Sequence, residues 1–308
     1  MLFIDRPDGT RVRSIPALNA LMPYMMPGRN NSAVYYERTV DLENALRLVK
    51  TRNWKQDEAG QDKEDTAKEG SYSLFGIVLG ALVRTVALKP RLNRFVHGKT
   101  LYQRNHISVS FIAKQRLSEE AVEASVKLFF DPEEGLPEVM RKMNEAIRLV
   151  RERGEGGDGD RIAKAAHAIP GGKSILIGIY RFLDRINLAP WSLIKADPLF
   201  ATAYFANLGS LGLDAPFHHL YEWGNASIFM AMGKLEENRH GRNQGSRRCI
   251  TFRITLDERI ADGLYFARAL STFARLLDSP ELLECTLEDA RKALAGGKRV
   301  EPELRDFG

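Results

Sequence analysis

Five segments of the chain repeat their hydrophobic residues at the three- and four-residue spacing that is typical of helices. They are residues 41–50, Leu74–Leu88, Leu136–Arg153, 175–188 and 263–277. Leu74–Leu88 is apolar almost all the way round and ends before Pro90, so we expect this helix to be deeply buried. Asp41 is a suitable N-cap for the first helix, and Pro190 follows the fourth. We expect every hydrophobic stripe to pack into the core.

Five further segments have the alternation or the residue types of β-strands. They are residues 107–113, 124–129, 202–206, 227–232 and 249–256. Residues 236–248 are polar and hold four arginines against two glutamates, which predicts a hairpin excursion. Residues 55–70 and 154–160 have too few apolar residues to form ordered structure, so we expect loops there. Helices early in the chain and strands clustered late predict an α+β fold with a mixed or antiparallel sheet.

The composition narrows the class of protein. With 308 residues, of which 44% are hydrophobic, the chain can form one domain with a well-buried core. The net charge of +5 is spread along the chain, so the arginine-rich residues 239–248 indicate a solvated hairpin and no nucleic-acid partner. Two cysteines exclude a disulfide scaffold and a four-thiolate metal site, and they suit a reducing cytoplasm. No apolar stretch predicts a membrane span or a secretory signal, so we expect a cytoplasmic protein without a membrane partner.

Common catalytic and nucleotide-binding motifs are missing. The chain has no G-x-x-x-x-G-K-[ST] loop and no glycine fingerprint between a strand and a helix, and residues 171–174 (GGKS) indicate a helix start. Its six histidines show no metal-ligand spacing, so we expect no metal. A serine–histidine–aspartate triad stays open, although the sequence has no G-x-S-x-G elbow.

Three stretches, taken in order, resemble a known family of enzymes. Residues 87–95 (ALKPRLNRF) resemble a helix end with the pattern P-x-L-N, and residues 204–212 (YFANLGSLG) resemble a T-I-S-N-L-G strand and turn. Residues 256–263 (LDERIADG) resemble D-H-R-x-x-D-G and are followed by a helix and SPELL at 279–283. Together they resemble the catalytic domain of the 2-oxo acid dehydrogenase acyltransferases and chloramphenicol acetyltransferase, over about residues 13–285.

The resemblance implies a compact α+β domain with a large mixed sheet, usually a homotrimer. It implies transfer of an acyl group between coenzyme A and a thiol or hydroxyl acceptor, in a channel between subunits that coenzyme A and the acyl carrier enter from opposite sides. Dehydrogenase complex components are possible partners. Nothing before residue 13 resembles a lipoyl or peripheral subunit-binding domain, so we expect residues 1–308 to be a stand-alone catalytic module without a bound lipoyl group.

The chain departs from the family at both chemical groups. The family uses a histidine as general base and a serine or threonine hydroxyl as donor to the oxyanion, and these positions hold Glu258 and Ala206 here. Asp262 and Gly263 are retained, and the resemblance implies that Asp262 pairs with an arginine, either Arg13 or Arg29.

Glu258 can be a weaker base or an ordinary surface residue. The reference pKa of glutamate lies about 2 units below that of histidine, which costs about 3 kcal/mol and roughly a hundredfold in rate. Burial in an apolar channel raises the pKa of a carboxyl and can recover this loss. The alternative is a solvated Glu258 or one that forms a salt bridge with Arg259 or Arg268.

His218 and His219 are the other candidates for the base. They follow the turn after Asn207, in a connection that runs close to the channel in the family, and the alternative is that they pack against Tyr221 or Trp223. The predicted catalytic set is therefore Glu258, Asp262, His218 and His219, and the predicted substrate-binding set is Ala206, Asn207, Ser210 and Gly263. Ser210 is a substitute for the lost hydroxyl, whereas Asn207 most simply forms the turn.

Two functions remain in competition. The first is an acyltransferase with an atypical active site. The second is a non-catalytic trimeric scaffold or regulatory relative that binds a ligand or an enzyme complex, because base and hydroxyl are lost together.

Overall fold

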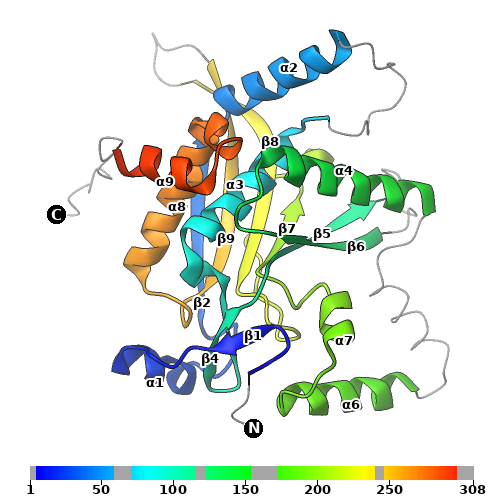
Figure 1. The fold of residues 1–308 in the computed structure, drawn as a ribbon, viewed down its shortest axis with the longest axis vertical. Coiled ribbons are helices and arrows are strands. Elements are labelled where there is room, and N and C mark those ends of the chain that lie inside the picture. The colour runs from blue at the N-terminus through cyan, green and yellow to red at the C-terminus, as the bar shows by residue number, and fades with distance from the viewer. Residues whose placement is uncertain (1–4, 59–70, 115–122, 154–171, 240–245, 297–308) are drawn as a thin grey trace.

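A six-stranded mixed sheet forms the centre of the structure, a computed structural model that describes residues 5–58, 71–114, 123–153, 172–239 and 246–296 (Figure 1). The strands follow the order β2 (Ala33–Asp41), β9 (Ser246–Asp257), β8 (Ile228–Arg239), β7 (Ala203–Asn207), β5 (Ile107–Lys114) and β6 (Glu123–Phe130). β7 runs parallel to both of its neighbours, and the other pairs are antiparallel. The α+β prediction with a large mixed sheet is confirmed.

Helices cover one face of this sheet, and smaller elements surround it. The covering helices are α3 (Leu74–Leu88), α4 (Leu136–Arg153) and α8 (Gly263–Asp278), with α2 (Glu43–Glu58) and α9 (Leu287–Gly296) beside them. The remaining helices are α1 (Ala17–Met25), α6 (Gly172–Arg185) and α7 (Trp191–Ala196), with the 3₁₀ turns η1 (Pro90–Asn93), η2 (Gly209–Leu211) and η3 (Pro280–Leu283). A second sheet has the order β1 (Gly9–Arg11), β4 (Thr100–Arg104) and β3 (Arg94–His97).

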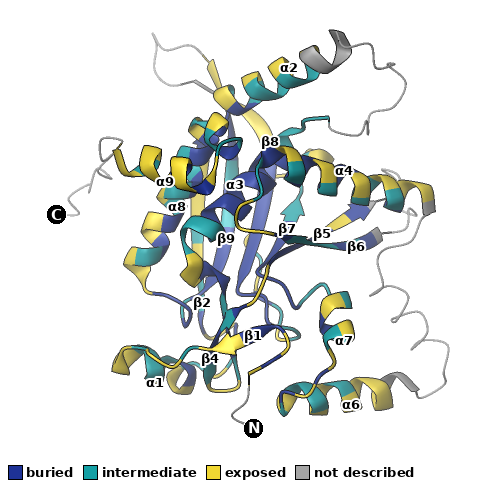
Figure 2. Ribbon diagram, viewed as in Figure 1, coloured by how far each residue is buried: buried dark blue, intermediate teal, exposed yellow. Residues whose placement is uncertain are grey.

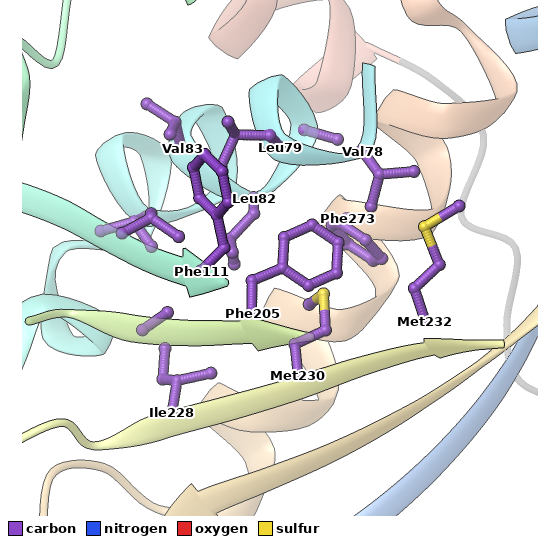
Figure 3. Packing of buried hydrophobic residues seen from close by; sticks show 14 of the residues in the cluster. Val78, Leu79, Leu82, Val83, Phe111, Phe205, Ile228, Met230, Met232 and Phe273 are labelled. Atoms are coloured by element: carbon purple, nitrogen blue, oxygen red, sulfur yellow. The ribbon is translucent and has the colours of Figure 1, made fainter. Parts of the chain in front are cut away.

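The main core lies between α3, α8 and the inner face of the sheet (Figure 3). Ser73 caps α3 by accepting a hydrogen bond from the Gly76 N–H, and the helix is buried from Gly76 to Val86, as predicted. A β-carbon on Gly76 would lie 2.2 Å from the sulfur of Met140, so glycine allows α4 to approach α3. Burying each large side chain here contributes about 1.5–3 kcal/mol. Figure 2 shows the buried residues concentrated in α3 and the central strands.

The boundaries of three predicted elements differ from the structure. α2 continues to Glu58, into the predicted loop of residues 55–70, whose remainder lies outside the described residues together with 154–160. Residues 236–239 and 246–248 pair with each other as antiparallel extensions of β8 and β9, as the arms of a hairpin do, and the register shifts between Met232 and Leu235. The helix predicted at 175–188 starts at Gly172, as the GGKS segment indicated, and ends at Arg185.

A buried network of charged and amide groups ties the N-terminal segment to the rest of the fold. Arg6 and Asp8 form a salt bridge at 2.8 Å, and Asn225 donates to Asp8 at 2.6 Å while accepting from Arg104 at 3.1 Å. Burial alone would raise the pKa of Asp8, but the charges of Arg6 and Arg104 outweigh it and lower the pKa. The network therefore holds Asp8 ionised and joins β4 to the loop before β8.

We expect His97 to make the protein sensitive to mild acid. Burial, with repulsion from Arg6, lowers the pKa of His97 to about 4, although Asp184 lies 3.7 Å away. A histidine with a depressed pKa contributes its stability fully above the unfolded value of about 6.5, and this stability is lost as the pH falls from 6.5 towards 4. Between pH 7 and pH 5 the free energy of unfolding should fall by about 2 kcal/mol from this group. Urea titrations at pH 7 and pH 5 should show a smaller fall in the free energy of unfolding for His97→Gln than for wild type. The exposed residue His219 gives a control, since His219→Gln should show the same fall as wild type. Equal sensitivity in wild type and His97→Gln would contradict this assignment.

The first turn of α8 depends on Asp262. Its carboxylate caps the helix by accepting a hydrogen bond from the Tyr265 N–H at 2.8 Å. Asp262→Ala should lower the free energy of unfolding by about 1 kcal/mol, because a backbone donor loses its partner. Asp262→Asn keeps an oxygen acceptor and should cost much less. Thermal unfolding of both variants distinguishes them, and an equal loss in the two would mean that charge, not capping, is what matters.

Candidate active site

The loop of residues 212–226 covers the face of the sheet that lies away from α3 and α8. Ile228, Met230 and Met232 point into the main core, so the alternation of the strand turns Phe229 and Ala231 outward. These outward residues form a second buried cluster with Tyr204, Ala215 and Leu220, against which Ala206 and Tyr221 pack. Both faces of β8 are therefore covered.

Side chains and backbone groups of β8, β9 and the segment before β2 hold this loop in place. The Lys234 N–H and the Arg253 guanidinium donate to the carbonyls of Leu213 and Ala215, at 2.9 and 2.7 Å. The hydroxyl of Thr255 donates to the carbonyl of His218. The buried guanidinium of Arg29 donates to the carbonyls of Tyr221, Glu222 and Trp223, at 2.9, 3.3 and 3.3 Å. Burial lowers the pKa of Arg29 to about 10, and the residue acts as a clamp on the loop.

His218 is held in one orientation and one tautomer. Its ring stacks on Phe229 with the centroids 3.8 Å apart and the planes 7° from parallel, and it lies beside His219 and Tyr221. Its Nδ1 lies 2.7 Å from the backbone carbonyl of His219. Because a carbonyl can only accept, neutral His218 carries its proton on Nδ1 and has a lone pair on Nε2. Among the described residues, Nε2 has no hydrogen-bond partner.

The environment of His218 favours the neutral imidazole. Burial lowers its pKa below the ordinary value, and this outweighs the hydrogen bond to the His219 carbonyl, which acts in the opposite direction. A neutral, half-buried imidazole with an available Nε2 has the chemistry of a general base. The packing against Tyr221, which the sequence analysis gave as the alternative for this histidine, is also present, so the same ring is both packed and chemically competent.

Glu258 lies just beyond the end of β9, next to the start of β2. Its N–H donates to the carbonyl of Ser32 at 2.9 Å. Burial raises the pKa of Tyr36, and the negative charge of Glu258 raises it further. Tyr36 packs on the main core and on Phe266 of α8. Within the described residues, no contact joins Glu258 to His218.

The ion pairs predicted for Glu258 and Asp262 are different in the structure. Arg259 forms a buried salt bridge with Asp257 at 2.7 Å, and within the described part of the chain Glu258 forms no ion pair. Asp262 lies 3.6 Å from Arg91, with both side chains about half exposed. The expectation that Arg13 or Arg29 is the partner of Asp262 is wrong, because Arg29 is committed to the loop carbonyls and η1 brings Arg91 to the start of α8. Gly263 is exposed beside this pair.

Ala206 and Asn207 lie at the carboxyl end of β7, and Ser210 lies in η2, which follows it. The Ser210 hydroxyl donates to the Asn207 carbonyl at 3.0 Å, and the Ser210 N–H lies 3.3 Å from the Asn207 side-chain oxygen. Asn207 thus forms the turn, as expected, and the Ser210 hydroxyl donates within the same turn.

The separation of Ala206 from Glu258 follows from the strand register. Ala206 pairs with Ala231, which pairs with Arg253, and Glu258 is five residues further along the chain. At about 3.4 Å per residue, this places them roughly 17 Å apart along the strand direction. A single chain cannot present both residues to one acyl group, so a site that uses both needs residues from two protomers.

Other candidate sites have little support. A hollow of about 470 Å³ on the outer side of β2, β8 and β9 is lined by Thr39, Glu236, Glu237, Cys249 and Thr251. Its two carboxylates would repel the phosphates of coenzyme A. In the described ranges, no group of three or more histidine, cysteine, aspartate or glutamate side chains could hold a metal. Among the described helices, none has the length and apolar character to cross a membrane.

Sequence reasoning missed the residues that support His218. Phe229 and Thr255 were not among the candidates, and Arg29 was considered only as a partner of Asp262. The uninterrupted apolar run of residues 228–232 already indicates a strand covered on both faces. Arg29 had no local signal, because its carbonyl partners lie 192 to 194 residues away in the chain.

Comparison with known proteins identifies the fold. No protein-family model and no curated protein sequence matches the chain. Dihydrolipoamide acetyltransferase of Azotobacter vinelandii superposes with a TM-score of 0.54 at 12% identity, covering 86% of this chain and 91% of that chain. A probable dihydrolipoamide acetyltransferase from Listeria monocytogenes gives a TM-score of 0.53 at 12% identity, over 88% of this chain and 95% of that one.

A catalytic core from an archaeal source agrees with these two. The truncated catalytic core of the 2-oxoacid dehydrogenase multienzyme complex from Thermoplasma acidophilum gives a TM-score of 0.52 at 10% identity, over 88% of this chain and 99% of that chain. A chloramphenicol acetyltransferase matches with a TM-score of 0.46 at 12% identity, over 84% of this chain and 94% of that chain. The chain therefore has the α+β fold of the acyltransferase cores of 2-oxo acid dehydrogenase complexes, as its three motif-like stretches predicted.

Proposed function

We propose that this protein transfers an acyl group between coenzyme A and a thiol or hydroxyl acceptor, with His218 as the general base. The shared fold supports the class of reaction. The observation that carries the proposal is the 2.7 Å contact between His218 Nδ1 and the His219 carbonyl, because it leaves Nε2 as the acceptor on a neutral ring.

The reaction would proceed by addition and elimination. Nε2 of His218 takes the proton from the acceptor S–H or O–H as the sulfur or oxygen forms a bond to the thioester carbonyl carbon. The tetrahedral intermediate then collapses, the carbon–sulfur bond to coenzyme A breaks, and the departing thiolate takes the proton back from Nε2. Phe229 and the Thr255–His218 contact position the ring throughout, so this part of the site needs no rearrangement.

We also propose that the protein acts as a homotrimer in the cytoplasm, alone or with dehydrogenase complex components. The separation of Ala206 from Glu258 along the sheet supports sites shared between protomers, since a second copy is needed to bring the two ends together. Glu258 and Asp262 are then part of the channel wall, with Glu258 as the alternative base. Asn207, Ser210 and Gly263 complete the proposed substrate-binding set, at the ends of the sheet where chains would meet.

A non-catalytic scaffold or regulatory relative is the competing function. Ala206 and Glu258 at the two motif positions favour it, because neither the family's base nor its hydroxyl donor is present. A scaffold needs no neutral imidazole with an available Nε2, so the tautomer of His218 favours catalysis.

Variants of the two candidate bases test the assignment. His218→Gln should lower kcat/KM by at least about a hundredfold, because the proton acceptor is removed. Glu258→Gln should change it by less than about threefold. His219→Gln is the matched control, since it keeps the backbone carbonyl that holds His218. Each variant is incubated with acetyl-coenzyme A and a panel of thiols. The rate at which free coenzyme A appears then gives kcat/KM for all three.

The pH profile gives a second criterion. Because burial lowers the pKa of His218, kcat/KM in wild type should rise with pH along a limb whose midpoint lies below about 6.5 and then reach a plateau. Full activity in His218→Gln would show that His218 is not the base, and loss in Glu258→Gln alone would transfer the role to Glu258. Absence of both turnover and coenzyme A binding in the wild type would favour the scaffold.

A further inference from the structure

Helix α6 leaves a row of large apolar side chains uncovered. Ile175, Ile179 and Phe182 follow one another at four- and three-residue spacing, and they are 66%, 53% and 61% exposed. Side chains at this spacing lie on one face of a helix. The sequence analysis expected every stripe to pack into the core, and for α6 this expectation is wrong, because a different face of the helix makes the contacts with the fold.

The inner face of α6 carries its polar and aromatic anchors. Tyr180 packs on Phe200 and Trp223, and the carboxylate of Asp184 forms a salt bridge with the buried Arg6 at 2.7 Å. The turn after α6 is also fixed, since Asn187 adopts a left-handed conformation with φ of 64° and is buried. α6 is therefore attached to the fold through its other face, and the apolar stripe lies at the surface.

The charges beside this stripe are positive. Arg181 and Arg185 are exposed on α6, whereas its acidic residue, Asp184, points inward to Arg6. At about 100° per residue, Arg185 and Arg181 follow Phe182 around the helix on one flank of the apolar stripe. An apolar stripe flanked by arginines is the arrangement of helices that lie in a membrane interface.

A second exposed apolar helix lies at the same end of the molecule. Leu18, Leu21 and Met25 on α1 are 67%, 54% and 67% exposed, at helical spacing, and α1 has no charged residue. Lys99 lies over the ring of Tyr24, with its ammonium 4.4 Å from the ring centroid, so a cation again borders the apolar surface. Figure 1 shows α1 and α6 at the same end of the longest axis, and Figure 2 shows both largely exposed.

We propose that the α1–α6 end binds the surface of a membrane that contains anionic lipids. The apolar stripes would enter the boundary between headgroups and acyl chains, and Arg181, Arg185 and Lys99 would contact the negative headgroups. α6 has 14 residues, a length of about 21 Å, and would lie along the surface rather than cross it. The earlier expectation of no membrane partner rested on the missing membrane span, which this mode of binding does not need.

Charge complementarity favours a membrane over a second copy of the chain at this surface. Two copies that met through their α6 stripes would bring exposed arginines towards arginines, with the carboxylate that could neutralise them buried against Arg6. An anionic lipid surface neutralises the same arginines and accepts the apolar stripe at once. This proposal is independent of the acyl-transfer proposal, since it uses none of the residues around His218.

Vesicle co-sedimentation of the full chain tests the proposal. Wild type should bind phosphatidylcholine vesicles that contain phosphatidylglycerol, bind pure phosphatidylcholine more weakly, and be released as salt rises. Phe182→Glu should weaken binding at least about tenfold, and so should Arg181→Glu combined with Arg185→Glu. The matched control is Trp54→Glu on α2, a residue that is 62% exposed at the other end of the molecule and should leave binding unchanged.

Folding and oligomeric state are measured on the same samples. The circular dichroism and melting temperature of Phe182→Glu should match those of wild type, because the side chain is mostly exposed, and Ile179→Glu serves as a second variant of the same stripe. Wild type that fails to bind anionic vesicles overturns the proposal, as does Phe182→Glu that binds like wild type. Light scattering distinguishes the remaining case. If wild type does not bind vesicles and forms an oligomer that Phe182→Glu dissociates, the surface is a contact between copies of the chain.

Discussion

The structure depends on the need to cover both faces of the six-stranded sheet. β8 is apolar on each side, so α3 and α8 bury one face while the loop of residues 212–226 must bury the other. A loop cannot satisfy its own carbonyls in an apolar setting, and Arg29, Arg253 and Thr255 supply the missing donors. The same arrangement that closes the fold also fixes the position of His218, so the stability of the loop and the chemistry of the site have one origin.

The length of the strands sets the second constraint. Glu258 and Ala206, the two positions compared with the family's base and hydroxyl, lie roughly 17 Å apart along the strand direction, and the ladder of backbone hydrogen bonds keeps them apart. His218 lies on the outer face, stacked on Phe229, which is two residues before the partner of Ala206 along β8.

The α1–α6 end shows a different balance of forces. Asp184 is held inward by Arg6, and this buried salt bridge decides which face of α6 meets the solvent. Rotating the helix to hide its isoleucines would break the Arg6–Asp184 salt bridge and leave the buried Arg6 with Asp8 as its remaining carboxylate partner. The exposed stripe is thus a consequence of the polar network beneath it, and it gives this end of the molecule a character unlike that of the helix-covered side.

The sequence by itself determined the fold class and most of the core. Periodicity located α3, α4 and α8 and the inner strands, because burial of one face imposes a local pattern, and the stretches around Asn207 and Asp262 indicated the acyltransferase fold. Tertiary structure alone decided what the local pattern does not record. It stacked His218 on Phe229, paired Asp262 with Arg91, and brought Arg29 to carbonyls 192 to 194 residues away. The periodicity of the sequence shows that one stripe of α6 is apolar. Which side of the helix faces the fold depends on the salt bridge between Asp184 and Arg6, which are 178 residues apart in the chain.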